Sequence, residues 1–351
     1  MRKSTFCTIL FTLGIFLLCA LPAAAAPRYT WKNLGSAPAP YNAGTYARAL
    51  NNSGQVTGYV TSAANNYHAF LYSGGVIQDL GTLPGDYRSF GNGINDAGEV
   101  VGNSDSVDAN HAFLYSGGGM QYLGTLPGGT GSTALGINGA GKIVGSSVTA
   151  TSPYDFPWHA FLSSGGGMQD LGTLAPGHQS TAQAINAGGQ VVGYADNAGW
   201  YERAFLWSGG GMQDLGTLGG NTSFAWAINA GGQVVGESQV VPNGYQHAFL
   251  YSGGGMQDLG TLPGGYRSIA YGINAAGQVV GYSSSLATGD RAFLYYGGVM
   301  YDLGTLTDPP LYLEKAYAIN DRGQIVGTSS TGSFLLTPIP VPVAFDLLLL
   351  N

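Results

Sequence analysis

The chain has 351 residues, of which 12 are Lys or Arg and 19 are Asp or Glu, so its formal net charge is −7. Only 9% of the residues are charged and no basic run occurs, which excludes a nucleic-acid-binding surface built from clustered Lys and Arg. Glycine supplies 59 residues, but 12% of the chain is aromatic, and that content favours a packed chain over a disordered one.

The chain begins with a predicted signal peptide, residues 1–25. Arg2 and Lys3 precede an apolar run that ends in the small residues Ala23–Ala26. The run is shorter than the roughly 20 residues of a spanning helix, so cleavage is favoured over an uncleaved anchor. A lipid-bearing Cys19 is a further alternative. We therefore expect a secreted or extracellular protein, with the periplasm and the cell surface as alternatives. Both cysteines lie in this leader, so the mature chain is expected to have no disulfide.

One unit then repeats along the chain with a spacing of about 44 residues. The Leu of a recurring Leu-Gly step marks it at Leu80, Leu123, Leu171, Leu215, Leu259 and Leu303. A period in the forties indicates a solenoid, a propeller or another array.

Each unit contains two predicted β-hairpins and hence four short strands. The first hairpin, GINAAGQVVG at 272–281, carries an Asn followed three residues later by Gly, and both recur in all seven units. Asn can bond the backbone two residues on, and Gly tolerates positive φ, so this pair predicts a tight turn. The second hairpin, HAFLYSGGGMQDLG at 247–260, joins two β-prone runs through a glycine turn. The invariant Asn residues are Asn51, Asn95, Asn138, Asn186, Asn229, Asn274 and Asn320.

The two ends of the array predict a closed ring. Residues 29–35 are a lone copy of the fourth strand, whereas the last unit, 316–337, lacks a fourth strand. We therefore predict an all-β domain over 29–337, a seven-bladed β-propeller whose N-terminal strand completes the last blade, in preference to a parallel β-helix. The six continuous blades are predicted at 44–83, 88–126, 131–174, 179–218, 222–262 and 267–306. The Pro-rich tail, 338–351, is expected to be an extended linker.

The repeated His-Ala-Phe at 68–70, 111–113, 159–161 and 247–249, with the Leu-Gly-Thr-Leu that follows, resembles the HAF-repeat family of extracellular repeat proteins of bacteria. The resemblance covers nearly the whole mature chain. It implies an exported repeat protein with no assigned reaction. Members often carry a PEP-CTERM-type sorting tail, and residues 338–351 resemble a truncated one without the Pro-Glu-Pro core or the basic terminus.

The repeated His and Asp residues are expected to form structural hydrogen bonds within the blades, because catalytic sites do not usually occur in several copies. We predict no catalytic residues, no metal site and no cofactor, since no zinc-type spacing or mature Cys occurs. Calcium at loop 103–110 is an alternative to a solvated loop.

The copies differ most in the loops between second and third strands and between blades, which share one face of a propeller. Exposed aromatic and Arg side chains in such loops are typical of recognition, although they could merely cap the blade edges. The predicted ligand-binding residues are Tyr87, Arg88, Trp158, His178, Trp200, Tyr201, Phe224, Tyr266 and Arg267.

We therefore expect a non-enzymatic binding or scaffold module with an extracellular glycan or a surface protein as partner. It is expected to be a monomer, without a nucleic-acid partner, and not an integral membrane protein once the leader is cleaved. One alternative is a glycan-active hydrolase or lyase on the same face, which needs an acid–base pair. Its candidate acids are Asp86, Asp155, Glu202 and Asp290, none with a recognisable partner in the sequence. The other alternative is a purely structural surface protein.

Overall fold

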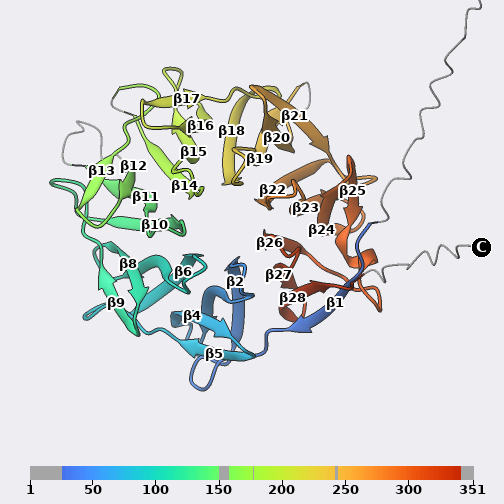
Figure 1. Ribbon diagram of the computed structural model, residues 1–351, viewed down its shortest axis with the longest axis horizontal. Coiled ribbons are helices and arrows are strands. Elements are labelled where there is room, and N and C mark those ends of the chain that lie inside the picture. Colours follow the sequence, from blue (N-terminus) through green and yellow to red (C-terminus); the bar gives the residue numbers. More distant parts are fainter. Residues whose placement is uncertain (1–25, 150–157, 177, 242–243, 341–351) are drawn as a thin grey trace, which may run out of the picture.

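The computed structural model describes residues 26–149, 158–176, 178–241 and 244–340, which form a ring of seven four-stranded antiparallel sheets (Figure 1). The predicted seven-bladed propeller is thereby confirmed. The predicted signal peptide and residues 341–351 of the tail lie outside the described residues. No helix within the described ranges is long and apolar enough to cross a membrane.

The strands follow the order predicted for each unit. Blade 1 contains β2 (Gly44–Leu50), β3 (Val56–Thr61), β4 (Tyr67–Ser73) and β5 (Val76–Asp79). Blade 2 contains β6 (Arg88–Ile94), β7 (Val100–Asp105), β8 (Asn110–Ser116) and β9 (Gly119–Tyr122). Blade 3 contains β10 (Ser132–Ile137), β11 (Ile143–Val148), β12 (Trp158–Ser163) and β13 (Met168–Asp170). Blade 4 contains β14 (Ser180–Ile185), β15 (Val191–Asp196), β16 (Glu202–Trp207) and β17 (Met212–Asp214). Blade 5 contains β18 (Gly219–Ile228), β19 (Val234–Val240), β20 (Gln246–Ser252) and β21 (Gly255–Gly260). Blade 6 contains β22 (Arg267–Ile273), β23 (Val279–Ser285), β24 (Gly289–Tyr296) and β25 (Val299–Asp302), followed by the short 3₁₀ helix η1 (Leu303–Leu306).

The last blade is assembled from both ends of the chain, as predicted. Its sheet has the order β1-β28-β27-β26, with β1 (Tyr29–Asn33), β26 (Lys315–Ile319), β27 (Ile325–Ser329) and β28 (Gly332–Pro338). The register runs antiparallel from Tyr29 opposite Pro338 to Asn33 opposite Phe334. Figure 1 shows β1, in blue, beside the red strands of this blade. The ring is thus closed by backbone hydrogen bonds, which leave no open blade at either end.

The core is divided among seven apolar clusters, each of which joins two neighbouring blades. The Phe that follows the His-Ala or Arg-Ala step in each of the first six blades, and its counterpart in the last blade, is at most 2% exposed. Full burial of such a side chain stabilises by roughly 2–3 kcal/mol. Sheet packing between blades therefore holds the ring together. The seven residues are Phe70, Phe113, Phe161, Phe205, Phe249, Phe293 and Phe334.

The invariant Asn residues form the predicted turns and also link the blades. Asn51 Oδ1 accepts hydrogen bonds from the backbone N–H groups of Ser53 (3.0 Å) and Gln55 (2.9 Å), and Gly54 has φ 78°. In addition, each Asn Nδ2 donates to the backbone carbonyl of the Asn in the next blade, over distances from 2.9 to 3.3 Å. The seventh bond, from Asn320 to Asn51, completes a closed circle of side-chain hydrogen bonds.

Replacing one member of this Asn ring should destabilise the whole propeller. Asn186→Ala removes the bond to the Asn229 carbonyl (3.1 Å) and leaves the Gln190 N–H without the side-chain oxygen that it contacts at 3.0 Å. Because each buried polar group left unpaired costs about 1–3 kcal/mol, we expect a loss of about 2–3 kcal/mol in urea unfolding. The exposed Asn221→Ala is the control and should change stability by less than about 0.5 kcal/mol. Equal changes in the free energy of unfolding for the two variants would contradict a stabilising role for the Asn ring.

Candidate functional site in the central channel

Each first strand carries a β-bulge at the same position, three residues before the invariant Asn. The pairing with the second strand shifts there in all seven blades, so one residue has no partner opposite it. A bulge re-aims a side chain, and here it directs the extra residue into the centre of the ring. The seven bulge residues are Arg48, Asn92, Leu135, Gln183, Trp226, Tyr271 and Tyr317.

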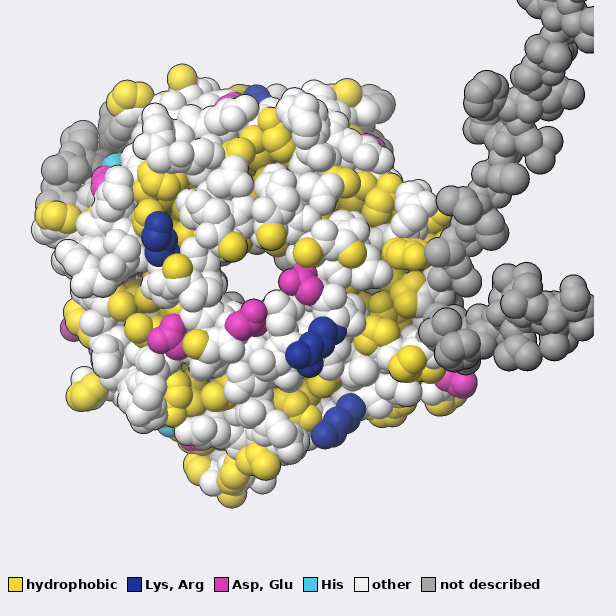
Figure 2. All heavy atoms as spheres, in the orientation of Figure 1, with side chains coloured by type: hydrophobic (Ala, Val, Ile, Leu, Met, Phe, Trp, Pro, Cys, Tyr) yellow, Lys and Arg dark blue, Asp and Glu magenta, His cyan; other side chains and the backbone are white. Residues whose placement is uncertain are grey.

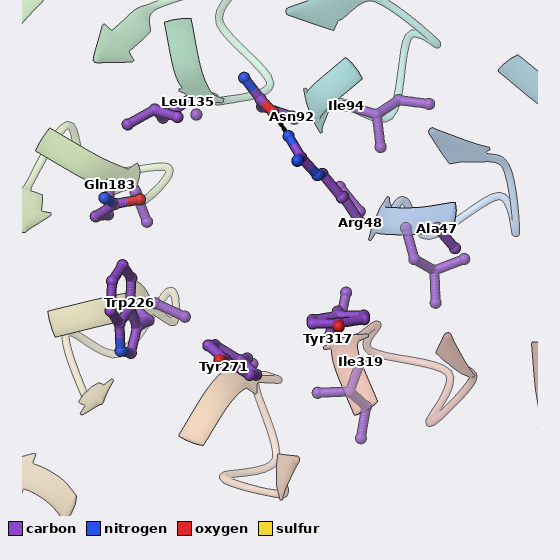
Figure 3. Close-up of a pocket in the computed structure, with 18 of the residues that line it drawn as sticks. Ala47, Arg48, Asn92, Ile94, Leu135, Gln183, Trp226, Tyr271, Tyr317 and Ile319 are labelled. Carbon is purple, nitrogen blue, oxygen red and sulfur yellow. Dashed lines mark hydrogen bonds between the residues drawn. The ribbon is translucent and has the colours of Figure 1, made fainter. Parts of the chain in front are cut away.

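These residues line a central channel with a volume of about 620 Å³ (Figure 3). Figure 2 shows its opening at the middle of the ring. We name the face with the blade-to-blade loops the loop-rich face and the face with the Asn turns the turn face. Between the bulge residues and the turn face lies a belt of aliphatic side chains. Its members are Leu50, Ile94, Ile137, Ile185, Ile228, Ile273 and Ile319.

One wall of the channel is aromatic. The Tyr271 ring lies 6.1 Å from Trp226 and 5.5 Å from Tyr317, measured between ring centroids, and 5.9 Å from Tyr282 on β23. Desolvation raises the pKa of the Tyr271 hydroxyl well above its usual range, so the phenol stays neutral. This wall offers flat apolar surfaces with hydroxyl groups at their ends.

Arg48 lies across the channel, on the polar side. Its guanidinium group donates a hydrogen bond to Asn92 Oδ1 and stands 4.9 Å from the Tyr59 ring centroid and 5.5 Å from that of Phe90. Asn92 is fixed in turn by donating to the Ala134 carbonyl at 3.0 Å. Desolvation by the surrounding blades lowers the pKa of Arg48 from its ordinary value. Within the described ranges, no carboxylate lies within ion-pair distance of this guanidinium.

The predicted ligand-binding residues occupy the loop-rich side of the ring, but the structure does not gather them into one cluster. Trp200, 60% exposed, stacks on His178 with ring centroids 3.7 Å apart. Its φ of 62° is left-handed, a conformation that costs a bulky residue roughly 1–2 kcal/mol. Tyr201 beside it is 44% exposed, and Arg88 stands 5.1 Å from the Tyr87 ring.

Four positions assigned from sequence to loops, or to their edges, belong to strands. Phe224 was expected in a blade-to-blade loop but lies in β18, because that strand already begins at Gly219. Its ring centroid lies 6.0 Å from that of Trp226, so Phe224 packs beside a residue of the aromatic wall. Arg88 and Arg267 are the first residues of β6 and β22, and Arg267 pairs with Glu237 at 3.3 Å. The other two predicted residues are Trp158, which begins β12, and Tyr266, whose ring is 5.1 Å from that of Tyr245.

The repeated His and Asp residues form hydrogen bonds within the blades, as predicted. His Nδ1 contacts the Asp carboxylate across the third and fourth strands at 2.9 Å in blade 1, 2.8 Å in blade 3 and 3.0 Å in blade 5. Burial raises the pKa of Asp79, but the hydrogen bonds from His68 and the Gly81 N–H outweigh it and hold that pKa below its usual value. The hydrogen-bonded pairs are His68–Asp79, His159–Asp170 and His247–Asp258.

Three unrepeated acids that had no partner in the sequence have neighbours in the structure. Asp86 pairs with His111 at 3.0 Å, because Tyr122 stands where the other blades have the bonding Asp. Asp290 pairs with Lys315 at 3.2 Å. Glu202 lies opposite Asp196 in the β15–β16 pairing, and its pKa is raised first by burial and then by Asp196. Asp155 lies outside the described residues.

No three His, Cys, Asp or Glu side chains in the described part of the chain gather where they could hold a metal ion. The predicted loop 103–110 is shorter in the structure, because Asn103 and Asp105 belong to β7 and Asn110 begins β8. The Asp105 carboxylate accepts a hydrogen bond from Asn103 Nδ2 at 2.7 Å. Calcium there stays an untested alternative.

The bulge residues were not predicted as site residues. The signal was present, since the position three residues before the invariant Asn holds six different residue types in seven units. Residues that pack in the core are the same or similar in all copies. A position inside a strand that varies between the copies is therefore more typical of a residue that lines a channel.

No known family model and no curated protein matches the sequence. Solved structures do resemble it. The YCF48 protein bound to D1 peptide shares 12% identity at a TM-score of 0.50, over 93% of this chain and 99% of that one. A prolyl endopeptidase shares 11% identity at a TM-score of 0.57, over 90% of this chain, which spans half the length of that enzyme. A lectin from Aleuria aurantia, solved with Fucα1-6GlcNAc, shares 11% identity at a TM-score of 0.42, over 73% and 94% of the two chains.

At these identities the likeness is one of fold. The chain is a seven-bladed β-propeller, and the comparisons carry no further than this fold.

Proposed function

We propose that this protein is an exported, HAF-type repeat protein that acts as a non-enzymatic binding or scaffold module through its loop-rich face and the channel that opens there. One observation carries the proposal. The units agree at the residues that build blades, and they differ at the bulge residues and in the loops of one face. A rigid scaffold with variable side chains around a concavity is the usual form of a binding site.

The repeated polar residues support binding over catalysis. In blades 1, 3 and 5 the His and Asp side chains satisfy each other, and the Asp also accepts a hydrogen bond from the backbone N–H two residues on. These hydrogen bonds join strands of the same blade, so the His and Asp side chains have a structural role within it. The partner that fits exposed Trp and Tyr side chains is an extracellular glycan or a surface protein.

A second candidate is a glycan-active hydrolase or lyase, favoured by Glu202 and Asp196. The two acids share a cleft with Trp158, and the raised pKa of Glu202 suits a general acid. Such an activity would release new reducing or unsaturated ends from bound glycans and would be lost in Glu202→Gln. Binding with no such product leaves the binding module as the function.

The binding proposal is tested on glycan and surface-protein arrays with a Trp158/Trp200/Tyr201 triple alanine variant. We expect the variant to lose at least tenfold in affinity, because exposed aromatic residues dominate recognition surfaces. The control replaces Val76, Tyr122 and Val299 by alanine, since these exposed residues lie on the outer strands β5, β9 and β25. Undiminished binding by the first variant would refute the site, and absence of any ligand would favour a purely structural surface protein.

A further inference from the structure

Among the described residues, Arg48 is the one charged residue in the section of the central channel that the bulge residues line, whereas Asp96 and Asp321 lie at its mouth on the turn face. The other lining side chains are aliphatic, aromatic, amide or hydroxyl groups. The chain as a whole is acidic, with a formal charge of −7. A single positive charge at the centre of an acidic ring is therefore a local feature that the overall composition does not explain.

Three basic residues at the loop-rich ends of the strands have acidic partners. Arg267 lies 3.3 Å from Glu237, Arg291 lies 3.7 Å from Asp302, and Lys315 lies 3.2 Å from Asp290. The hydrogen bond that the structure gives Arg48 goes to a neutral amide oxygen. A guanidinium group that is partly desolvated without a counter-charge gains free energy when a carboxylate reaches it.

The groups opposite Arg48 favour a ring-shaped ligand with several hydroxyls. Figure 3 shows Trp226, Tyr271 and Tyr317 along the wall that faces Arg48, with Gln183 between Trp226 and Leu135. The C–H face of a pyranose packs on aromatic rings, while its hydroxyls bond amide and phenol groups such as Gln183 and Tyr271. The channel volume of about 620 Å³ lies in the range of small-molecule pockets.

We propose that the central channel binds an acidic sugar, a uronic acid unit within an oligosaccharide. Its carboxylate pairs with Arg48, and its ring packs against Trp226 and Tyr271. This inference rests on the proposed function as a binding module and names the ligand class for the channel. The guanidinium can form a bidentate pair with a planar carboxylate, a geometry that a lysine would not reproduce.

The test is calorimetric titration with trimers of galacturonate, glucuronate and mannuronate, each compared with its methyl ester. The ester keeps the ring and removes the charge. We expect at least one acid trimer to bind about ten- to a hundredfold more tightly than its ester, because charge-assisted hydrogen bonds contribute on that scale. Arg48→Gln should abolish this preference for the acid over its ester, while Trp226→Ala should weaken acid and ester alike.

Two further variants keep the result interpretable. Arg322→Gln removes an arginine from a turn of the other face and should leave the preference intact. If Arg48→Gln unfolds, Arg48→Lys retains the charge and should keep a reduced preference for the acid. Equal binding of acid and ester by the wild type or by Arg48→Lys would overturn the inference.

Failure of the inference differs from failure of the binding module. If the arrays find a ligand that depends on Trp158, Trp200 and Tyr201 while no uronate trimer binds at millimolar concentration, the module stands and the acidic sugar is excluded. Binding of tri-glutamate but of no uronate would assign the channel to acidic peptides and also overturn the inference. If the wild type binds neither array ligands nor uronates, both proposals fall.

Discussion

Replacing Tyr29 by alanine is expected to destabilise the propeller by about 3–5 kcal/mol, the range for loss of a large buried aromatic side chain. Tyr29 is fully buried at the first position of β1, packed with Leu303, Leu313 and Leu336. Its backbone pairs with Pro338 on β28, so the side chain anchors the strand that closes the ring. The free energy of unfolding in urea measures the effect.

Tyr29→Phe is the matched control, with the opposite expectation. The Tyr29 hydroxyl is buried and has no hydrogen-bond partner among the described residues. Removing it relieves an unsatisfied polar group, so stability should be unchanged or higher by about 1 kcal/mol. A loss of stability below about 1 kcal/mol for Tyr29→Ala, or one above about 3 kcal/mol for Tyr29→Phe, would contradict this prediction. Burial of the Tyr29 aromatic side chain would then not be what stabilises the closed propeller.

The fold was predictable because the repeat carries two independent signals. Alternation and turn residues such as Asn51 and Gly54 predict each hairpin locally. The permuted ends, 29–35 and 316–337, predict the closure without any knowledge of three-dimensional contacts. Burial of the repeated Phe and Val follows once the blades are arranged radially. The hairpins and the closure can therefore be read from the order and copies of the repeat, which a single sequence displays directly.

The channel was not predictable in the same way, because it depends on pairing. A bulge is defined by two strands, and the sequence of β14 alone does not show that Gln183 lacks an opposite residue. Likewise the Asn ring joins side chains to carbonyls in the next unit, a contact that turn chemistry does not require. The contact of His111 with Asp86 also depends on a neighbouring unit. Tyr122 stands where other blades have the bonding Asp, so His111 contacts an Asp of the preceding blade-to-blade loop instead.

The second large expected effect is that of Gly193→Ala, which tests the bulge itself. Gly193 pairs with Ala182, directly before the bulge in β14, and a Cβ atom there would lie 1.9 Å from the Thr181 carbonyl oxygen. The same approach, 1.8 to 2.0 Å, occurs at the equivalent glycine of every blade, which explains why all seven units keep it. Backbone atoms on both sides must move, so we expect a loss of about 3 kcal/mol or more in urea unfolding.

Gly166→Ala provides the comparison, because the same chemical change meets different surroundings. Gly166 is exposed in the turn before β13, its φ is not left-handed, and no atom lies within 4 Å of the added methyl group. Because alanine has fewer backbone conformations than glycine, the substitution lowers the entropy of the unfolded chain. It should therefore stabilise the folded protein by about 0.4–1 kcal/mol. The two variants should therefore differ in sign. If Gly193→Ala proves as stable as the wild type, the first and second strands do not approach as closely as the bulge requires. The placement of Gln183 and its six counterparts in the channel would then have to be revised.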